Sequence, residues 1–142
     1  MRVYSGGTYD LFHWGHVEML RRLRDIAGPD GVVIVAVNTD EFVEQFKGKR
    51  PVMSLEERMA VVAACRYVDV VVPNLSGADS RPTILETGAD FVVTGTDWCE
   101  RDYMAQMSFT REWLEENGIG FGFIPYTAGV SSTDVRSRLS KQ

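Results

Sequence analysis

Short β-branched or aromatic runs alternate with longer helical segments, and this alternation constrains the fold more than any other feature. Five runs predict strands, at residues 2–5, 31–37, 67–72, 90–94 and 120–124. Six segments predict helices, at residues 15–27, 40–45, 54–66, 82–87, 103–117 and 131–139. Strict alternation of this kind is typical of α/β folds with a mostly parallel sheet, and right-handed crossovers place helices on both faces. We therefore expect a single Rossmann-like domain over residues 1–142.

Local signals support these elements. Val17, Leu20, Leu23 and Ala27 recur at helical spacing, and a Gly-Pro pair then ends the first helix. The run 31–37 is apolar without interruption, as expected for a strand that is buried on both faces.

Composition excludes several classes of function. The chain has 142 residues and a net charge of -5, which disfavours non-specific binding to nucleic acids or membrane surfaces. No apolar run approaches the roughly 20 residues of a membrane span, and the start lacks the apolar segment of a signal peptide. The two cysteines are isolated in the sequence, so we expect neither a disulfide framework nor a metal site built on them, and a cytoplasmic location.

In sheets of this kind, ligands bind at the carboxyl ends of the strands, so the loops 6–15, 38–53, 95–98 and 125–132 are candidates. In the first, a Gly-Gly-Thr turn precedes His13 and His16, which open a helix on either side of Gly15. A helix N-terminus presents free N–H groups and partial positive charge, and residues three apart lie on one face. This pattern indicates a phosphate site. The alternative is that one histidine caps the helix and the other lies in the core. A dehydrogenase is disfavoured, because no Gly-x-Gly-x-x-Gly follows the first strand.

The ten residues 7–16, Gly-Thr-Tyr-Asp-Leu-Phe-His-Trp-Gly-His, resemble the signature of the HxGH nucleotidylyltransferases, and most of all its cytidylyltransferase branch. Members transfer a nucleoside monophosphate from a triphosphate to a phosphorylated acceptor and release pyrophosphate. The resemblance implies that His13 and His16 contact the triphosphate and stabilise the transition state. It also implies nucleotide contacts by Gly7, Thr8, Tyr9, Asp10 and Gly15. Asp10 is a candidate either for positioning or for the Mg²⁺ that such enzymes use with the triphosphate.

A basic loop agrees with this resemblance. Lys47, Lys49 and Arg50 place three cations in four residues of an acidic chain, which indicates an anion clamp rather than an ordinary solvated loop. The resemblance assigns charge neutralisation to Lys47 and Lys49, and we place Arg58, together with Asp40, at the acceptor. The run 65–69, Cys-Arg-Tyr-Val-Asp, resembles part of the choline-, ethanolamine- and glycerol-phosphate cytidylyltransferases.

The segment after the fourth predicted strand is Thr-Gly-Thr-Asp-Trp. By resemblance, Gly95 and Asp97 flank the nucleoside, and Trp98 is assigned to the acceptor, with the core or a dimer interface as alternatives. Thr96 stands where the family usually has aspartate, which puts nucleoside affinity or base choice in question.

The segment 126–133 resembles the Arg-Thr-x-Gly-Ile-Ser-Thr-Thr of the same enzymes. Ser131, Ser132 and Thr133 would donate hydrogen bonds to the triphosphate, although residues of these types also simply cap helices. Tyr126 replaces the family's arginine, and Arg136 and Arg138 are available to compensate.

The resemblance covers residues 3–139 and, by size, is strongest to the glycerol-3-phosphate branch. It implies transfer of CMP from CTP to a small phosphorylated alcohol, with glycerol 3-phosphate as the favoured acceptor, and it implies a homodimer. One alternative is an adenylyltransferase that uses ATP, because residues 47–52 also resemble the bacterial heptose-phosphate adenylyltransferases. Another is a nucleotide-binding protein without catalysis, which the replacements at positions 96 and 126 would suit.

Overall fold

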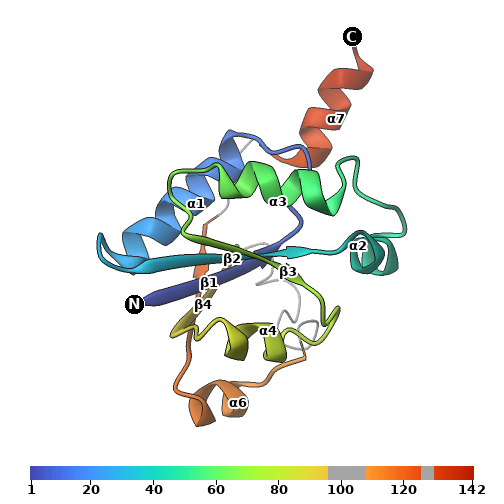
Figure 1. Ribbon diagram of the computed structural model, residues 1–142. Coiled ribbons are helices and arrows are strands. Elements are labelled where there is room, and N and C mark those ends of the chain that lie inside the picture. Colours follow the sequence, from blue (N-terminus) through green and yellow to red (C-terminus); the bar gives the residue numbers. More distant parts are fainter. Residues whose placement is uncertain (96–107, 126–129) are drawn as a thin grey trace.

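The computed structural model describes residues 1–95, 108–125 and 130–142 (Figure 1). The strands are β1 (Arg2–Gly7), β2 (Val32–Asn38), β3 (Val70–Asn74), β4 (Phe91–Gly95) and β5 (Gly120–Ile124). The helices are α1 (Trp14–Ala27), α2 (Asp40–Lys47), α3 (Leu55–Ala63), α4 (Arg81–Glu86), α6 (Arg111–Glu116) and α7 (Ser132–Ser140). The strands form one sheet in the order β3-β2-β1-β4-β5, and every neighbouring pair is parallel. The predicted α/β class and five-stranded sheet are confirmed.

Each face of the sheet has its own buried cluster. Val33 and Val35 of β2 pack in one cluster with Leu20 of α1. Ile34, which points to the opposite face, packs in the other with Ile84 of α4. Helices α1 and α3 lie on one side of the sheet, and α4 and α6 lie on the other (Figure 1). The interior strand β2 is therefore buried on both faces, which explains its uninterrupted apolar sequence.

The order of the strands reverses in the middle of the sheet. The chain moves outward from β1 to β2 and β3, then returns to place β4 beside β1, with Tyr4 in register with Val92. Connections that leave the two central strands in opposite directions open a crevice at their carboxyl ends. Gly7 and Gly95, the last residues of β1 and β4, border this crevice.

The connection between α3 and β3 differs from the prediction. Helix α3 ends at Ala63 rather than at residue 66, and β3 begins at Val70 rather than at residue 67. A turn intervenes, in which the Val68 N–H donates to the Cys65 carbonyl at 3.1 Å. The strand also continues past residue 72 through Pro73, which is tolerated because β3 is an edge strand and needs ladder hydrogen bonds on one side only.

Helix α6 is shorter than predicted. It begins at Arg111, where the Thr110 hydroxyl accepts a hydrogen bond from the Trp113 N–H at 3.1 Å. The earlier part of the predicted helix, residues 103–107, lies outside the described residues. None of the helices in the described ranges is long and apolar enough to cross a bilayer.

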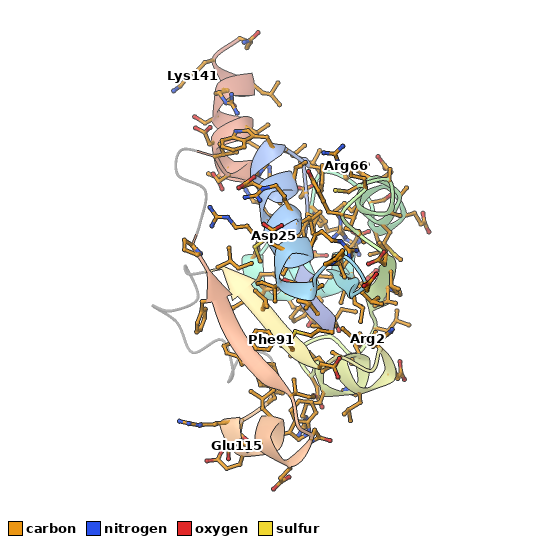
Figure 2. All side chains as sticks on the ribbon, turned by 90° about the vertical axis from the view of Figure 1, so that its left-hand side faces the viewer. Arg2, Asp25, Arg66, Phe91, Glu115 and Lys141 are labelled. Atoms are coloured by element: carbon orange, nitrogen blue, oxygen red, sulfur yellow. The ribbon has the colours of Figure 1, made fainter. Side chains whose placement is uncertain are left out.

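Helix α7 stands away from the rest of the molecule. None of its residues is buried, and Figure 2 shows Lys141 beyond its end, far from the sheet. Its N-terminal turn, in contrast, reaches the carboxyl end of the sheet, where the Ser132 hydroxyl donates to the Asp10 carbonyl at 2.5 Å. The helix thus presents its first turns to the crevice and the remainder to solvent.

Candidate active site

A cavity of about 640 Å³ lies at the reversal in strand order. Its walls come from the ends of β1 and β4, the start of α1, the loop after α2 and the start of α7. Its described lining contains a single carboxylate, that of Asp10. It also contains five cationic side chains, those of Arg22, Lys47, Lys49, Arg50 and Arg136. Since the whole chain has a net charge of -5, this local positive excess favours an anionic ligand.

His13 and His16 line this cavity and cap α1 at the same time. His13 is the N-cap residue, and its Nδ1 accepts a hydrogen bond from the Gly15 N–H at 3.1 Å. In return, Nδ1 of His16 accepts from the His13 N–H, also at 3.1 Å. This is a capping box made by imidazoles instead of hydroxyl and carboxylate groups. Capping and ligand binding, which the sequence presents as alternatives, are both available to this pair.

The two capping bonds determine the tautomers of the rings. A nitrogen that accepts a hydrogen bond carries no proton, so in the neutral form the proton of each imidazole lies on Nε2. The rings stack with centroids 3.9 Å apart and an interplanar angle of 27°. Nε2 of His13 is buried and has no hydrogen-bond partner within the described residues. Two adjacent uncharged rings, each with its N–H on Nε2, therefore line the cavity.

The surroundings keep both rings neutral. Burial, followed by the proximity of His13 and Lys47, lowers the pKa of His16 to about 3. Burial and then the charge of Arg138 lower the pKa of His13, against the opposing effect of Asp134. Without a bound anion, both histidines are hydrogen-bond donors without net charge at neutral pH.

Close packing explains the glycine between the histidines. A Cβ on Gly15 would lie 2.9 Å from Cε1 of His13 and 3.3 Å from a methyl carbon of Val130. The preceding loop is also constrained, because Tyr9 and Leu11 have φ angles of 55° and 50°. Non-glycine residues adopt this left-handed conformation at a cost of about 1–3 kcal/mol, and such residues cluster at functional sites.

Lys47 and Lys49 line the cavity on the side of α2. Gly48 ends that helix in a left-handed conformation, which turns the chain between the two lysines. Within the described part of the chain, neither ammonium group has a carboxylate partner. Desolvation, followed by the charges of Arg136, Lys49 and Arg58, lowers the pKa of Lys47, although the residue as a whole is exposed. The cavity that the two histidines line is therefore also lined by two lysines that no carboxylate neutralises.

Asp10 joins three segments around the cavity. Its carboxylate accepts from the Val52 and Met53 N–H groups at 2.8 and 2.9 Å, and from Arg136 at 2.6 Å. Burial opposes ionisation, but the two backbone hydrogen bonds and the charge of Arg136 outweigh it and lower the pKa of Asp10. The ionised side chain thus links the loop after α2 to helix α7 by hydrogen bonds.

The three hydroxyl residues at the start of α7 line the cavity, although they differ in their hydrogen bonds. The Ser131 hydroxyl caps the helix by accepting from the Asp134 N–H at 2.9 Å. The Ser132 hydroxyl donates to Asp10, and Thr133 is exposed. Residues at the starts of α1 and α7 both line the cavity, so the partial positive charge of two helix N-termini lies beside it.

The structure corrects the expectation that Arg58 and Asp40 contact an acceptor. Arg58 has no exposed surface, and its guanidinium donates to the carbonyls of Thr8, Asn38 and Met53. A further donor binds the Asp40 carboxylate at 2.6 Å. Neither Arg58 nor Asp40 lines the cavity. Their physical role is to hold together the backbone behind the site.

The remaining predicted residues divide into two groups. Gly7, Thr8, Tyr9 and Gly95 line the cavity. Asp97 and Trp98 lie outside the described residues, as do Thr96 and Tyr126.

Some lining residues were not predicted as site residues, notably Arg22 and Asn38. Arg22 looks like part of a solvated helix face, yet it donates to the carbonyl of Pro125, another lining residue, at 2.9 Å. Asn38 was detectable, because it is the last residue of a strand whose carboxyl end was expected at the site.

The described residues do not fit a magnesium ion held by the protein. No group of three His, Cys, Asp or Glu side chains gathers in those parts of the chain. The oxygens of Asp10, the candidate ligand, accept three N–H groups already. Any Mg²⁺ at this site would therefore be held chiefly by the phosphates of the nucleotide.

The neutrality of His16 predicts a loss of stability in weak acid. In the unfolded chain the histidine has a pKa of 6.5, against about 3 in the folded protein. Between these values the unfolded state binds a proton that the folded state does not, so the free energy of unfolding falls as pH falls. The slope from this group approaches about 1.4 kcal/mol per pH unit. Asp10, whose pKa is also lowered, acts in the same direction only below its unfolded value of 3.8.

Urea unfolding at pH 7, 6 and 5 measures this slope. His16→Asn, which cannot titrate in this range, is the control and should show a flatter dependence on pH. Equal slopes for the two proteins would contradict a neutral His16.

An α/β crevice with two helix N-termini, paired imidazole donors and free lysines defines a protein that handles the phosphates of a nucleotide. Residues 4–138 match the family model described as cytidylyltransferase-like. The chain belongs to this family, and it is a nucleotidyltransferase.

Similar proteins agree with this assignment. The chain is 33% identical over 138 residues to the glycerol-3-phosphate cytidylyltransferase of Staphylococcus aureus, covering 97% of this chain and 94% of the relative. It is 30% identical over 143 residues to the FAD synthase of Korarchaeum cryptofilum, covering 99% and 92%. Among solved structures, the lipopolysaccharide core biosynthesis protein of Thermoplasma volcanium matches with a TM-score of 0.67 at 22% identity, over 89% of this chain and 96% of that one. This last likeness supports the fold.

Proposed function

We propose that the protein transfers CMP from CTP to glycerol 3-phosphate and releases pyrophosphate. The observation that carries this proposal is the cavity itself, where two uncharged imidazole donors and two unpaired lysines face one space at the strand ends. A phosphate oxygen of the acceptor attacks the α-phosphorus in line. The new O–P bond forms as the bond between the α-phosphorus and the bridging oxygen breaks, and pyrophosphate leaves with that electron pair.

Catalysis then consists of positioning and charge stabilisation, because the acceptor phosphate is already a nucleophile. The Nε2–H groups of His13 and His16 donate to the β- and α-phosphate oxygens, respectively, as negative charge moves toward the leaving group. Lys47 and Lys49 approach the same phosphates from the opposite wall. The start of α7 adds hydroxyl and backbone N–H donors. This arrangement neutralises a polyphosphate without any covalent intermediate.

The charges of the lining support an acceptor that is uncharged apart from its phosphate. Phosphocholine and phosphoethanolamine carry a cation, which a free carboxylate would neutralise. Within the described lining, the only carboxylate is that of Asp10, and its oxygens already bind Val52, Met53 and Arg136. Five cationic residues in the same lining would repel an ammonium group. A polyol phosphate has no cationic group, so it needs no carboxylate partner and is not repelled by these residues.

A pyrophosphate-release screen tests the proposal. CTP and ATP are each paired with glycerol 3-phosphate, phosphoethanolamine, a sugar 1-phosphate and FMN, and products are identified by mass spectrometry. We expect turnover with CTP and glycerol 3-phosphate to exceed every other pair by at least about tenfold, or about 1.4 kcal/mol in transition-state stabilisation. Faster turnover with ATP would establish the adenylyltransferase alternative, to which the FAD synthase likeness and the basic loop 47–52 lend support. Dimerisation stays a prediction from the resemblance.

A further inference from the structure

Asn38, the last residue of β2, lines the cavity and has no role in the mechanism above. Its side chain belongs to a chain of hydrogen bonds between the ends of neighbouring strands. Oδ1 of Asn38 accepts from Nδ2 of Asn74, the last residue of β3, at 3.2 Å. Nδ2 of Asn38 donates to the Thr8 hydroxyl over a longer distance, 3.4 Å. Because Thr8 also lines the cavity, these hydrogen bonds lead from β3 to the cavity wall.

A backbone carbonyl fixes the direction of these hydrogen bonds. Nδ2 of Asn74 donates to the Gly77 carbonyl at 3.1 Å as well as to Asn38. A carbonyl can only accept, so reversing the Asn74 amide would set two oxygens against each other. Asn38 must therefore present its oxygen to Asn74 and its NH₂ group to the side of Thr8. That group has two N–H donors, and Thr8 takes one of them, so the second is available to a ligand.

The backbone of Thr8 and Asn38 is held from behind by one buried group. A single nitrogen, Nη1 of Arg58, donates to the carbonyls of both residues at 2.8 Å. Asn38 itself is only 8% exposed. Its amide is therefore oriented before any ligand arrives, and binding does not have to order it.

The cavity wall next to Asn38 is uncharged. Phe42 and Val43, in the first turn of the helix that follows, are buried and line the cavity. The lysines come only at the other end of that helix and beyond it, at Lys47 and Lys49. Phosphates are attracted to those cations and to the helix N-termini. A neutral amide donor beside apolar side chains suits a hydroxyl group instead.

The topology of the sheet indicates which substrate supplies that hydroxyl. Strands β2 and β4 flank β1 on opposite sides. The β4 side ends in Gly95, which has no side chain, and its neighbour β5 ends in the apolar Ile124, and both residues line the cavity. That open apolar surface suits a planar base. The β2 side, where Asn38 lies, is then left to the acceptor.

We propose that the second N–H of Asn38 donates to a hydroxyl on the carbon chain of the acceptor, so that Asn38 selects a polyol phosphate over other phosphorylated acceptors. This inference rests on the proposed function and names a residue that determines its acceptor. An acceptor without the hydroxyl would leave the amide donor desolvated and unpaired, and so would be used less well.

Steady-state kinetics with CTP and three acceptors test this contact. The acceptors are glycerol 3-phosphate and two analogues that each lack one hydroxyl, 2-hydroxypropyl phosphate and 3-hydroxypropyl phosphate. For the unaltered protein, kcat/KM should be at least about fivefold lower with one of the analogues. Asn38→Ala should lose a similar factor with glycerol 3-phosphate but change by less than about twofold with that analogue, because the hydroxyl that Asn38 binds is already missing. An unchanged KM for CTP checks that the cavity is formed.

Asn38→Asp is a second variant that preserves the hydrogen bond from Asn74. One carboxylate oxygen still accepts from Asn74, and the other replaces the donor. Turnover of glycerol 3-phosphate should fall, and the ratio of kcat/KM for phosphoethanolamine to that for glycerol 3-phosphate should rise by at least about tenfold, since the ammonium group gains a carboxylate partner. Asn117→Asp makes the same change at an exposed residue that does not line the cavity, and it should leave this ratio unchanged.

The outcomes distinguish this inference from the proposed function. Equal losses of kcat/KM for all three acceptors in Asn38→Ala, a raised KM for CTP instead, or an unchanged ratio in Asn38→Asp would show that Asn38 does not select the acceptor. Nucleotidyl transfer would still stand in each of these cases. If the unaltered protein releases no pyrophosphate with any of these acceptors and either CTP or ATP, the proposed function fails and this inference fails with it.

Discussion

Asparagine in place of His16 is expected to lower kcat by about 10²–10³-fold, the usual effect of removing one preorganised donor from a transition state. The amide oxygen of asparagine lies where Nδ1 lies, so it can still accept the His13 N–H and preserve the helix cap. It has no group at the position of Nε2. The variant therefore separates the capping function from the donor function, and CTP affinity should fall much less than kcat.

His16→Gln is the complementary control. The amide N–H of glutamine reaches the position of Nε2, but the side chain does not accept the capping hydrogen bond from the His13 N–H. We expect it to retain more activity than His16→Asn and to lose about 1 kcal/mol of stability. Steady-state pyrophosphate release and urea unfolding, measured on both variants, supply the comparison. If the two variants lose activity equally, or His16→Asn keeps full turnover, the ring donors do not stabilise the transition state.

Methionine in place of Arg58 should destabilise the fold by about 3–5 kcal/mol, as expected when one partner of a buried ion pair is removed. The change leaves the Asp40 carboxylate and three carbonyls, those of Thr8, Asn38 and Met53, without their donor. The free energy of unfolding in urea, followed by circular dichroism, measures the loss.

Arg111→Met is the matched control, since Arg111 is 81% exposed and pairs with Glu115 one turn away. It should change stability by less than about 0.5 kcal/mol. If Arg58→Met kept its stability and instead raised the KM for the acceptor, the original assignment of Arg58 to substrate binding would stand and the structural role would be wrong.

The sequence predicted the fold well where hydrophobic pattern and local signals agree. The bounds of β2 and β5 and the Ser54 cap of α3 lie within one residue of their predicted positions. The misplaced boundaries depend on tertiary contacts. Asp69 stays outside the strand because its carboxylate binds the Val33 N–H of the neighbouring strand and Arg24. No local propensity encodes such a partner.

The candidate site, like the fold, could be predicted only where local sequence signals determine it. Spacing and residue type predicted that His13, His16 and the Lys47–Lys49 loop lie together, because strand ends meet at one edge of a parallel sheet. Charge alone could not distinguish Arg58, which is wholly internal, from Arg136, which lines the cavity. A basic residue is equally basic in either place, and only the three-dimensional neighbours decide whether it serves the backbone or a ligand.

Helix α7 supplies part of the site but none of the core. Its attachment relies on polar contacts with Asp10, whereas the sheet is held by two apolar clusters. Regions with few buried apolar contacts open at lower free energy than the rest of a protein. On warming, the C-terminal segment should therefore detach while the sheet remains intact, so that enzymatic turnover is lost several degrees before the cooperative melting transition.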